Sequence, residues 1–337
     1  MSHIKLSICI PTKNFGEYIG QTLDSIIDQI DDSVEILIYD GGSIDNTQEI
    51  ISGYQNRYNG IKYIRKENAG GVDLDLAEAI KLASGRYCWP VSADDVIVPG
   101  AIKEILKEIE SGYETYVINR IDCTIDLTPK RYRYWLDKTI DTAVYDFSKE
   151  NEIKYYFKNS NSLGAVFSYI SSIIFLKSFW NRVGIDKSFT GSYYLLAYTL
   201  LKSFKNGGYH KYIKKHLILC RGGNDSFLQP TDEGIIRRYH IDLNGFISIG
   251  QAMNYTNTVQ DAFFSILGKE HPWYIWIRVA IRERDESTWN NLLDNLKLIG
   301  LTRFQILLIK YIRFIEKGFP VFKIIRTLRK SIKLHAK

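Results

Sequence analysis

The sequence predicts an α/β protein whose mainly parallel sheet is covered by helices on both faces, and three observations support this fold class. Short apolar runs alternate with helical patterns along the first 110 residues, as in strands joined by crossover helices. The apolar run from Ile36 to Tyr39 ends abruptly in acidic, small and turn-forming residues that begin with Asp40. Hydrophobic residues make up 45% of the 337-residue chain and charged residues 24%, so we expect a large core and exclude disorder as the main state.

The first three strands are short apolar runs separated by two amphipathic segments. We predict strands at Leu6 to Ile10, Val34 to Tyr39 and Ile61 to Arg65. The first helix has an apolar face formed by Ile19, Leu23, Ile26, Ile27 and Ile30. The second helix, which Asp45 can cap, has an apolar face formed by Ile50, Ile51, Tyr54 and Tyr58.

The next elements continue this alternation. A third helix that ends at Gly85 carries Leu76, Ile80 and Ala83. A strand is predicted from Tyr87 to Val91, although Pro90 inside it indicates an edge or a bulge. Pro99 opens a further helix whose apolar face is formed by Ile102, Ile105, Leu106 and Ile109.

One later segment alternates basic and aromatic residues, from Arg131 to Trp135. We interpret this alternation as a half-exposed edge strand. An aromatic shelf that binds a ligand is the alternative, because 23 tyrosines exceed what a core needs and Tyr hydroxyls require water or a hydrogen-bond partner.

The cysteines and the N-terminus bear on the compartment. Cys9, Cys88, Cys123 and Cys220 are far apart and show neither metal-site nor disulfide spacing. Free thiols in apolar runs indicate a reducing compartment, the first residues lack a signal-peptide pattern, and no apolar run approaches the roughly 18 residues of a membrane span. We therefore expect a cytoplasmic protein.

The last segment of the chain is strongly basic. From Lys297 to Lys337 there are eleven Lys or Arg against one acid, Glu316, so this segment carries a formal +10 and the rest of the chain −4, within the total of +6. Two amphipathic helices are predicted, separated near Gly318 to Pro320. Their apolar residues are Phe304, Leu308, Ile312 and Ile315, then Val321, Ile324, Ile325, Leu328 and Ile332. Their basic residues are Lys310, Arg313 and Lys317, then Lys323, Arg326, Lys330 and Lys333.

Three interpretations of this basic segment are open. Peripheral binding to an anionic membrane surface is favoured, because the charge is so one-sided. A helical pair that packs on the rest of the protein and has a solvated basic face is the second. Nucleic-acid binding is the third, and since no nucleic-acid-binding motif accompanies the charge we expect no nucleic-acid partner.

Two nucleotide-binding classes are excluded by the loops. The first strand-to-helix turn, from Pro11 to Gly16, lacks the glycine fingerprint that lets backbone approach a pyrophosphate, which argues against NAD or FAD. A phosphate-binding loop ending in Gly-Lys-Ser/Thr is also missing from the sequence. A diphosphate would then be held through a metal ion.

Three blocks in order resemble the family 2 glycosyltransferases of the GT-A fold: Leu6 to Asn14, Ile36 to Thr47, and Trp89 to Asp95. The resemblance covers residues 4 to 110 well and 160 to 226 loosely. It implies that Pro11, Thr12, Asp40 and Gly41 hold the nucleoside of a nucleoside-diphosphate sugar, and that Asp73 touches the donor. Asp40 as a turn cap and Asp73 as a helix-start acid are the structural alternatives.

The resemblance also implies a metal site. Family members usually carry Asp-x-Asp, whose carboxylates bind Mg²⁺ or Mn²⁺ on the donor phosphates. Ser92 stands here in place of the first aspartate, and Asp94 and Asp95 remain. One carboxylate with phosphate oxygens and waters still suits a hard divalent ion, so Asp94 is the expected ligand and Asp95 the second candidate.

The family's usual acidic pair, which supplies the base that deprotonates the acceptor, has no counterpart in the segment Phe189 to Tyr194. Asp186 and Asp225 are the candidate replacements. The alternative is transfer with retention of anomeric configuration, which requires no such base. Arg221, beside a Gly-Gly turn, is a candidate for balancing diphosphate charge.

Within the family, Ser92 to Asp95, Asp40 to Ser43 and Arg221 to Ser226 look most like O-antigen enzymes of the abequosyltransferase type. That likeness implies a 3,6-dideoxyhexose donor such as CDP-abequose, an undecaprenyl-diphosphate-linked oligosaccharide acceptor, and a place at the inner face of the cytoplasmic membrane. We expect a nucleotide-sugar-binding half (1–110), an acceptor-side part (111–265) and a basic helical region (266–337). A sugar-nucleotide binder or assembly scaffold without catalysis is the alternative, because Ser92 and the missing base depart from the pattern.

Overall fold

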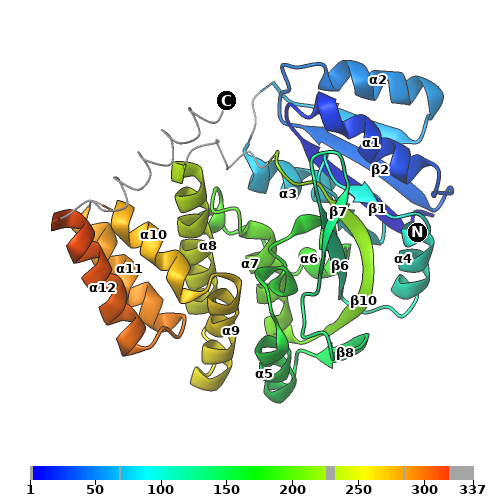
Figure 1. Ribbon diagram of the computed structural model, residues 1–337. Coiled ribbons are helices and arrows are strands. Elements are labelled where there is room, and N and C mark those ends of the chain that lie inside the picture. The colour runs from blue at the N-terminus through cyan, green and yellow to red at the C-terminus, as the bar shows by residue number, and fades with distance from the viewer. Residues whose placement is uncertain (1–2, 68–69, 225–231, 284, 319–337) are drawn as a thin grey trace.

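The computed structural model describes residues 3–67, 70–224, 232–283 and 285–318 (Figure 1). Its strands are β1 (Leu6–Thr12), β2 (Val34–Asp40), β3 (Ile61–Arg65), β4 (Tyr87–Pro90), β5 (Val96–Ile97), β6 (Thr115–Cys123), β7 (Pro129–Arg133), β8 (Ala143–Asp146), β9 (Ile173–Leu176) and β10 (Tyr209–Cys220). They form one ten-stranded sheet in the order β3-β2-β1-β4-β9-β6-β10-β5, with β7 paired to β6 and β8 to β10.

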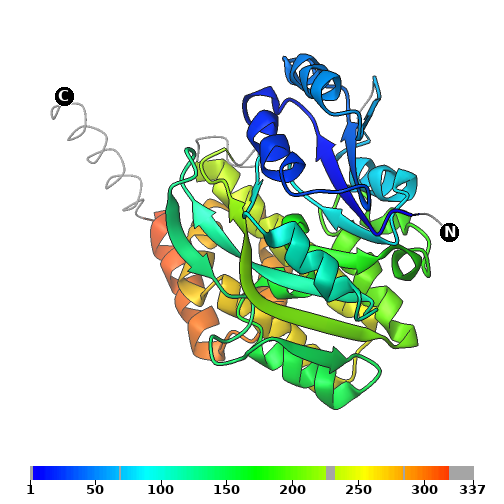
Figure 2. The ribbon, with the colours of Figure 1, turned by 90° about the vertical axis from the view of Figure 1, so that its right-hand side faces the viewer.

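Helices cover both faces of this sheet, which confirms the predicted fold class (Figures 1 and 2). They are α1 (Gly16–Ile27), α2 (Thr47–Arg57), α3 (Val72–Leu82), α4 (Ala101–Ile109), α5 (Glu150–Asn159), α6 (Lys177–Trp180), α7 (Leu195–Ser203), α8 (Asp232–Met253), α9 (Asn257–Glu270), α10 (Trp273–Arg282), α11 (Glu286–Leu298) and α12 (Arg303–Gly318). The predicted boundary at residue 110 falls between α4 and β6, and the boundary at residue 265 falls inside α9.

The alternation of side chains along β1 separates the two cores. Leu6, Ile8 and Ile10 belong to the core on the face of α1, α2 and α4. Cys9, one position out of phase, belongs to the larger core on the other face, with α3, α5, α7 and the helices from α8 to α12. Successive strand residues point to opposite faces, so a fully apolar strand contributes side chains to both cores.

The parallel part of the sheet is the order β3-β2-β1-β4, in which every neighbouring pair is parallel. β6 and β10 are parallel as well. The sequence did not indicate β9, which pairs antiparallel with both β4 and β6 and joins these two parallel groups. Pro90 is the last residue of β4, so its missing N–H interrupts no ladder inside the strand. The segment from Arg131 forms part of β7, which pairs with β6 at the edge, as expected.

The basic helix α12 is confirmed, but the faces assigned to it are wrong. Ile306 and Ile309 are buried, whereas Phe304 is 74% exposed. Arg313, expected on the solvated face, is buried: its guanidinium lies 4.1 Å over the Trp289 ring, pairs with Glu286 (3.2 Å) and donates to a backbone carbonyl. A long Arg side chain packs its stem like a hydrophobic residue. The second predicted helix, 321–332, lies outside the described residues.

Across the described residues, none of the helices combines the length and the apolar character that crossing a membrane requires. All four cysteines are free thiols.

Candidate active site

The topological switch point of the parallel sheet places the loops singled out in the sequence at one edge of the sheet. β1 lies between β2 and β4, so the chain runs outward through β2 and β3 and then returns to the other side of β1. Such a switch point opens a crevice at the carboxyl ends of the strands, where α/β proteins bind ligands. The switch-point crevice is therefore expected between the end of β1 with its following loop, Pro11 to Asn14, and Ser92 to Asp95, which follow β4.

The loops after β1 and β2 are fastened to each other. The backbone N–H of Asn14 donates to Oγ of Ser43 (2.8 Å), and the Asn14 side-chain oxygen accepts from the N–H of Ile44 (2.8 Å). The N–H of Gly16 donates to the Asp45 carboxylate (3.0 Å), which also accepts from Thr47 at the start of α2. The sequence indicated Asp45 as a helix cap but did not indicate that it joins two loops.

Gly42 allows the second loop to pass close to the end of β3. Its φ of +88° belongs to the left-handed region, and a Cβ atom here would lie 2.7 Å from the carbonyl oxygen of Glu67. Arg65 holds the same loop by donating to the Ser43 carbonyl (2.9 Å). A side chain at position 42 would displace the rim of the crevice.

Asp40 lies at the end of β2 as predicted, but its side chain is completely buried. One oxygen accepts from the N–H and the hydroxyl of Ser43 (both 2.8 Å), and the other accepts from the Tyr63 hydroxyl (2.7 Å). Burial raises the pKa of Tyr63, and the neighbouring Asp40 carboxylate raises it further. In this arrangement Asp40 shapes the loop from Gly41 to Ser43, and a direct contact with donor stays a prediction.

Thr12 and Gly41, at the ends of β1 and β2, are the other residues expected to bind the nucleotide-sugar donor. The N–H of Gly41 donates to the carbonyl of Thr12 (2.9 Å), which holds the ends of β1 and β2 together. The Thr12 hydroxyl is buried and has no hydrogen-bond partner among the described residues. An orphaned buried hydroxyl carries a desolvation cost, and a ligand entering the crevice beside Pro11 would relieve it.

Asp94 and Asp95 are adjacent but have opposite environments. Asp94 is partly exposed; one carboxylate oxygen accepts from the Ser92 hydroxyl and the other from the Asn224 amide (2.6 Å). Asp95 is 2% exposed and accepts from Tyr169 and Ser171 through one oxygen (both 2.5 Å). Burial and the neighbouring Asp94 raise the pKa of Asp95 to about 7.

These environments decide which carboxylate fits a metal ion. Among the described residues, no group of three or more His, Cys, Asp or Glu side chains could hold one. Mg²⁺ is commonly bound by one or two carboxylates with substrate phosphates and waters, so the exposed carboxylate of Asp94 fits a donor-dependent site. Asp95 does not fit, because it is buried and its oxygens are used by the protein. Ser92, in the place of the usual first aspartate, donates to Asp94 and orients it.

Arg221 is next to Asp94 but is used by the fold. Its side chain is 6% exposed and its Nε donates to the Asp94 carbonyl (3.0 Å). Its other guanidinium nitrogens donate to the Ile125 carbonyl and the Gln21 side chain. Arg221 therefore ties the end of β10 to α1 and to the Asp94 turn, and direct pairing with a diphosphate stays a prediction.

Asp73 is also engaged within the protein. It is buried and accepts from the N–H of Tyr193 (2.9 Å), in the segment that replaces the expected acidic pair. Burial raises its pKa, while backbone N–H groups of Gly191 to Leu195 oppose the rise. Asp73 positions this segment, in which Tyr193 has a φ of +65°, against the start of α3.

The candidate bases remain without support from the geometry. Asp186 accepts from Ser188, Tyr198 (2.8 Å) and Lys202, and the hydrogen bonds from Ser188 and Tyr198 lower its pKa to about 2. A carboxylate this acidic is a weak general base. Asp225 lies outside the described residues.

Several contacts of the site were missed by sequence reasoning. Tyr63, Tyr169, Ser171 and Asn224 all bind the two key turns through their side chains, yet each is tens of residues away from its partner in the chain. No local pattern marks such residues, because their role depends on how distant strands are brought together.

Comparison with known proteins agrees with this geometry. Residues 7–179 match the family model of Glycosyl transferase family 2. The chain is 33% identical over 275 residues to the Abequosyltransferase RfbV of Salmonella typhimurium, covering 80% of this chain and 81% of that protein. It is 28% identical over 113 residues to Glycosyltransferase GlyG of Streptococcus pneumoniae, covering 34% of this chain and 38% of that protein.

Solved structures share the fold at low sequence identity. TarS 1–349 of S. aureus, in complex with UDP, has a TM-score of 0.62 at 16% identity, over 92% of this chain and 87% of that one. The mannosyltransferase PcManGT of Pyrobaculum calidifontis, in complex with GDP-Man and Mn²⁺, has a TM-score of 0.53 at 13% identity, over 94% and 87%. The fold is that of the GT-A glycosyltransferases. The chain belongs to glycosyl transferase family 2, and its activity is that of a hexosyltransferase.

Proposed function

We propose that this enzyme moves a 3,6-dideoxyhexose, abequose or a close relative, from its CDP-sugar to a lipid-linked oligosaccharide during surface-polysaccharide synthesis. The similarity to RfbV over four fifths of both chains carries the choice of sugar. The partly exposed carboxylate of Asp94 at the switch-point crevice carries the proposal of catalysis. In the alternative scaffold hypothesis, the same crevice would bind the nucleotide without turnover.

The two sides of the crevice have separate tasks in this proposal. The rim formed by Pro11, Thr12 and the loop from Gly41 holds the nucleoside, with the Thr12 hydroxyl available to it. Asp94, held by Ser92 and Asn224, faces the diphosphate and would bind Mg²⁺ or Mn²⁺ there. The bound ion would neutralise charge that grows on the leaving nucleoside diphosphate. Asp95 and Arg221 hold the Asp94 turn in place.

The missing base bears on stereochemistry. The expected acidic pair is absent and the pKa of Asp186 is low, so we propose transfer with retention of anomeric configuration, in which the acceptor hydroxyl approaches the same face that the leaving group departs from. NMR coupling constants of the product report the new anomeric configuration. A configuration opposite to that of the donor would contradict this proposal.

Incubation with CDP-abequose and a lipid-diphosphate-linked oligosaccharide tests the function. We expect the acceptor to gain one dideoxyhexose, detected by mass, with no comparable gain from UDP-, dTDP- or GDP-hexoses. Nucleotide binding without transfer from any of these donors would favour the scaffold hypothesis.

We also propose that α12 binds an anionic membrane surface, where such an acceptor lies. The outward face of α12 carries large apolar side chains at spacings of three and four residues: Phe304, Leu307, Tyr311 and Phe314, which are 61 to 75% exposed. Arg303, Lys310 and Lys317 are exposed along the adjoining edge. A helix with an exposed aromatic stripe bordered by basic residues suits the interface of an anionic bilayer.

Replacing Phe304 and Phe314 by Ser is expected to weaken binding to liposomes containing anionic lipid by about tenfold or more, since each buried ring is worth roughly 1.5 kcal/mol or more. Cosedimentation of the full chain measures the effect. Tyr155→Ser with Ile185→Ser, which removes two other exposed apolar side chains, is the matched control and should bind as wild type does. Equal retention of all three proteins would show that α12 is not the contact.

A further inference from the structure

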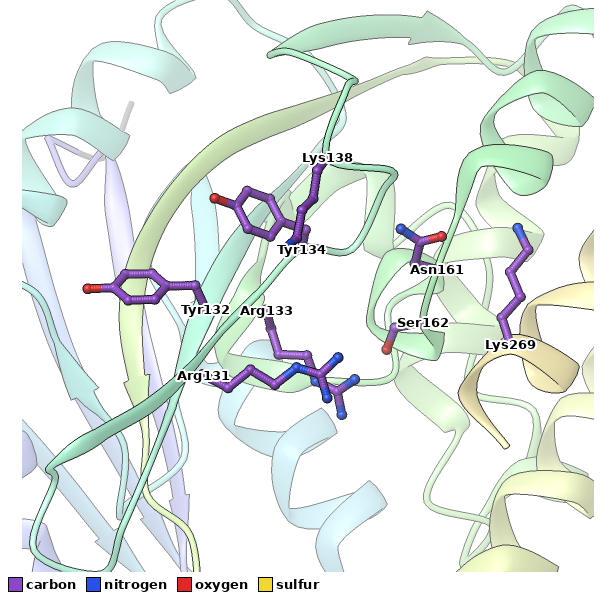
Figure 3. Close-up of a pocket in the computed structure, with 8 residues that line it drawn as sticks. All are labelled: Arg131, Tyr132, Arg133, Tyr134, Lys138, Asn161, Ser162 and Lys269. Atoms are coloured by element: carbon purple, nitrogen blue, oxygen red, sulfur yellow. The ribbon is translucent and has the colours of Figure 1, made fainter. Parts of the chain in front are cut away.

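A second cavity, separate from the crevice, opens between the edge strand β7 and the C-terminal helices (Figure 3). Its volume is about 540 Å³. Arg131, Arg133 and Lys138 line it from β7 and the following loop, and Asn161 and Lys269 line it from the other side. Figure 3 shows the side chains of Arg131 and Arg133 extending from β7 toward the side of the cavity that Ser162 lines.

The lining of the cavity is cationic, with four Arg or Lys and no Asp or Glu. The charge of Arg133 is balanced by ion pairs with Asp122 (3.3 Å) and Glu270 (3.4 Å). Arg131 is exposed and Lys138 lies 5.4 Å over the Tyr134 ring; within the described part of the chain neither forms an ion pair. The cavity therefore offers two uncompensated cations to a ligand.

Lys269 contributes a third donor. Its ammonium group donates to the carbonyls of Lys158 (2.6 Å) and Ser160 (2.7 Å), at the end of α5. Burial lowers its pKa. An anion in the cavity would favour the charged form of Lys269, because an opposite charge offsets the desolvation of an ammonium group.

The cavity is connected to the donor crevice by a continuous series of polar side chains. Tyr169 donates to Asp95, and the Arg120 guanidinium lies 4.0 Å over the Tyr169 ring. Arg120 pairs with Asp122 (2.8 Å), and Asp122 pairs with Arg133 of the cavity. The series thus passes from Arg120 and Asp122 of β6 to Arg133 of β7, two strands that pair in the sheet.

We infer that this cavity binds a phosphate or diphosphate group, namely the diphosphate that links lipid to oligosaccharide in the acceptor, an assignment that rests on the proposed function. Guanidinium and ammonium groups are the side chains that bind phosphate oxygens. The site would position the acceptor sugar relative to the donor crevice, and it would reject acceptors that lack the diphosphate.

Titration calorimetry with inorganic pyrophosphate in EDTA tests the site without turnover. The double variant Arg131→Ala/Lys138→Ala is expected to bind pyrophosphate about tenfold or more weakly than wild type, since hydrogen bonds to charged groups are the strong ones. The control is Lys103→Ala/Lys107→Ala, which removes the same charge from exposed positions of α4. Equal weakening in both double variants, or none in either, would overturn the assignment.

Acceptor kinetics distinguish a lipid-linked diphosphate from free phosphate. In the Arg131→Ala/Lys138→Ala variant, KM for a lipid-diphosphate-linked acceptor should rise at least about tenfold, while KM for the donor stays unchanged. A tenfold excess of inorganic phosphate should compete poorly with that acceptor. An unchanged acceptor KM would overturn the acceptor role. If wild type transfers no sugar at all, the proposed function fails, yet the pyrophosphate titration still decides whether this cavity binds phosphate.

Discussion

Replacing Asp94 by Asn lowers sugar transfer by roughly two to three orders of magnitude, while the protein stays folded. Asp94 is the partly exposed carboxylate at this edge of the sheet. The amide of Asn keeps its size but loses the charge, and it can accept only one of the two hydrogen bonds that the carboxylate accepts from Ser92 and Asn224. Losing one electrostatic contact to a charge that develops in the transition state costs about 10²- to 10³-fold in kcat. Initial rates with saturating Mn²⁺ and nucleotide-sugar measure the effect.

The matched control is Asp28→Asn, which neutralises an exposed carboxylate at the end of α1. It should leave the rate within about twofold of wild type. A comparable loss in both variants would indicate a general charge effect. Full activity of Asp94→Asn would exclude Asp94 as the metal ligand and would require another anchor for the diphosphate.

Acid destabilises the folded protein through His210. The imidazole is completely buried, between the Thr115 hydroxyl (2.7 Å) and the Tyr156 hydroxyl (3.0 Å), and burial lowers its pKa to about 3 from the usual 6.5. Between these two pH values the unfolded chain binds a proton that the folded protein excludes. The free energy of unfolding therefore falls as pH decreases from 6.5 toward 3, by on the order of 4 kcal/mol in total for this one group.

Urea unfolding at a series of pH values measures this slope. His210→Gln should lower the free energy of unfolding at pH 7, because the Thr115 and Tyr156 hydroxyls lose their hydrogen bonds to the imidazole. The decline of that free energy between pH 6.5 and 4 should become shallower, by the contribution of about one proton. His3→Gln, at an exposed histidine, should keep the slope of wild type. Parallel pH profiles for all three proteins would show that His210 does not titrate on unfolding.

The sequence predicted the parts of the fold that depend on local periodicity. The apolar runs of β1, β2 and β3 and the helices between them are visible in single segments, and the position of Asp94 follows from a buried strand that ends in acidic residues. β9 was missed because its run, Ile173–Leu176, is short and its antiparallel pairing depends on strands far away in the chain.

The state of the site residues was harder to predict than their location. Asp40 and Arg221 lie where the sequence placed them, but their partners come from β3, α1 and the β6–β7 connection, and those partners bury them. Burial and hydrogen bonding decide whether a carboxylate meets a ligand or holds a loop, and neither is a local property. The faces of α12 were assigned wrongly for a related reason: Arg313 found an acidic and aromatic partner on α11.

Thermal unfolding with CDP, UDP, dTDP and GDP, each with and without Mn²⁺, tests most directly whether the switch-point crevice is a metal-assisted donor site. Nucleotide at a hundred times its Kd adds about 2.7 kcal/mol to the free energy of unfolding. We expect stabilisation of wild type by CDP alone of the four, only with Mn²⁺, and its loss in Asp94→Asn. Stabilisation that persists without metal or in Asp94→Asn, or none with any nucleotide, would contradict this account.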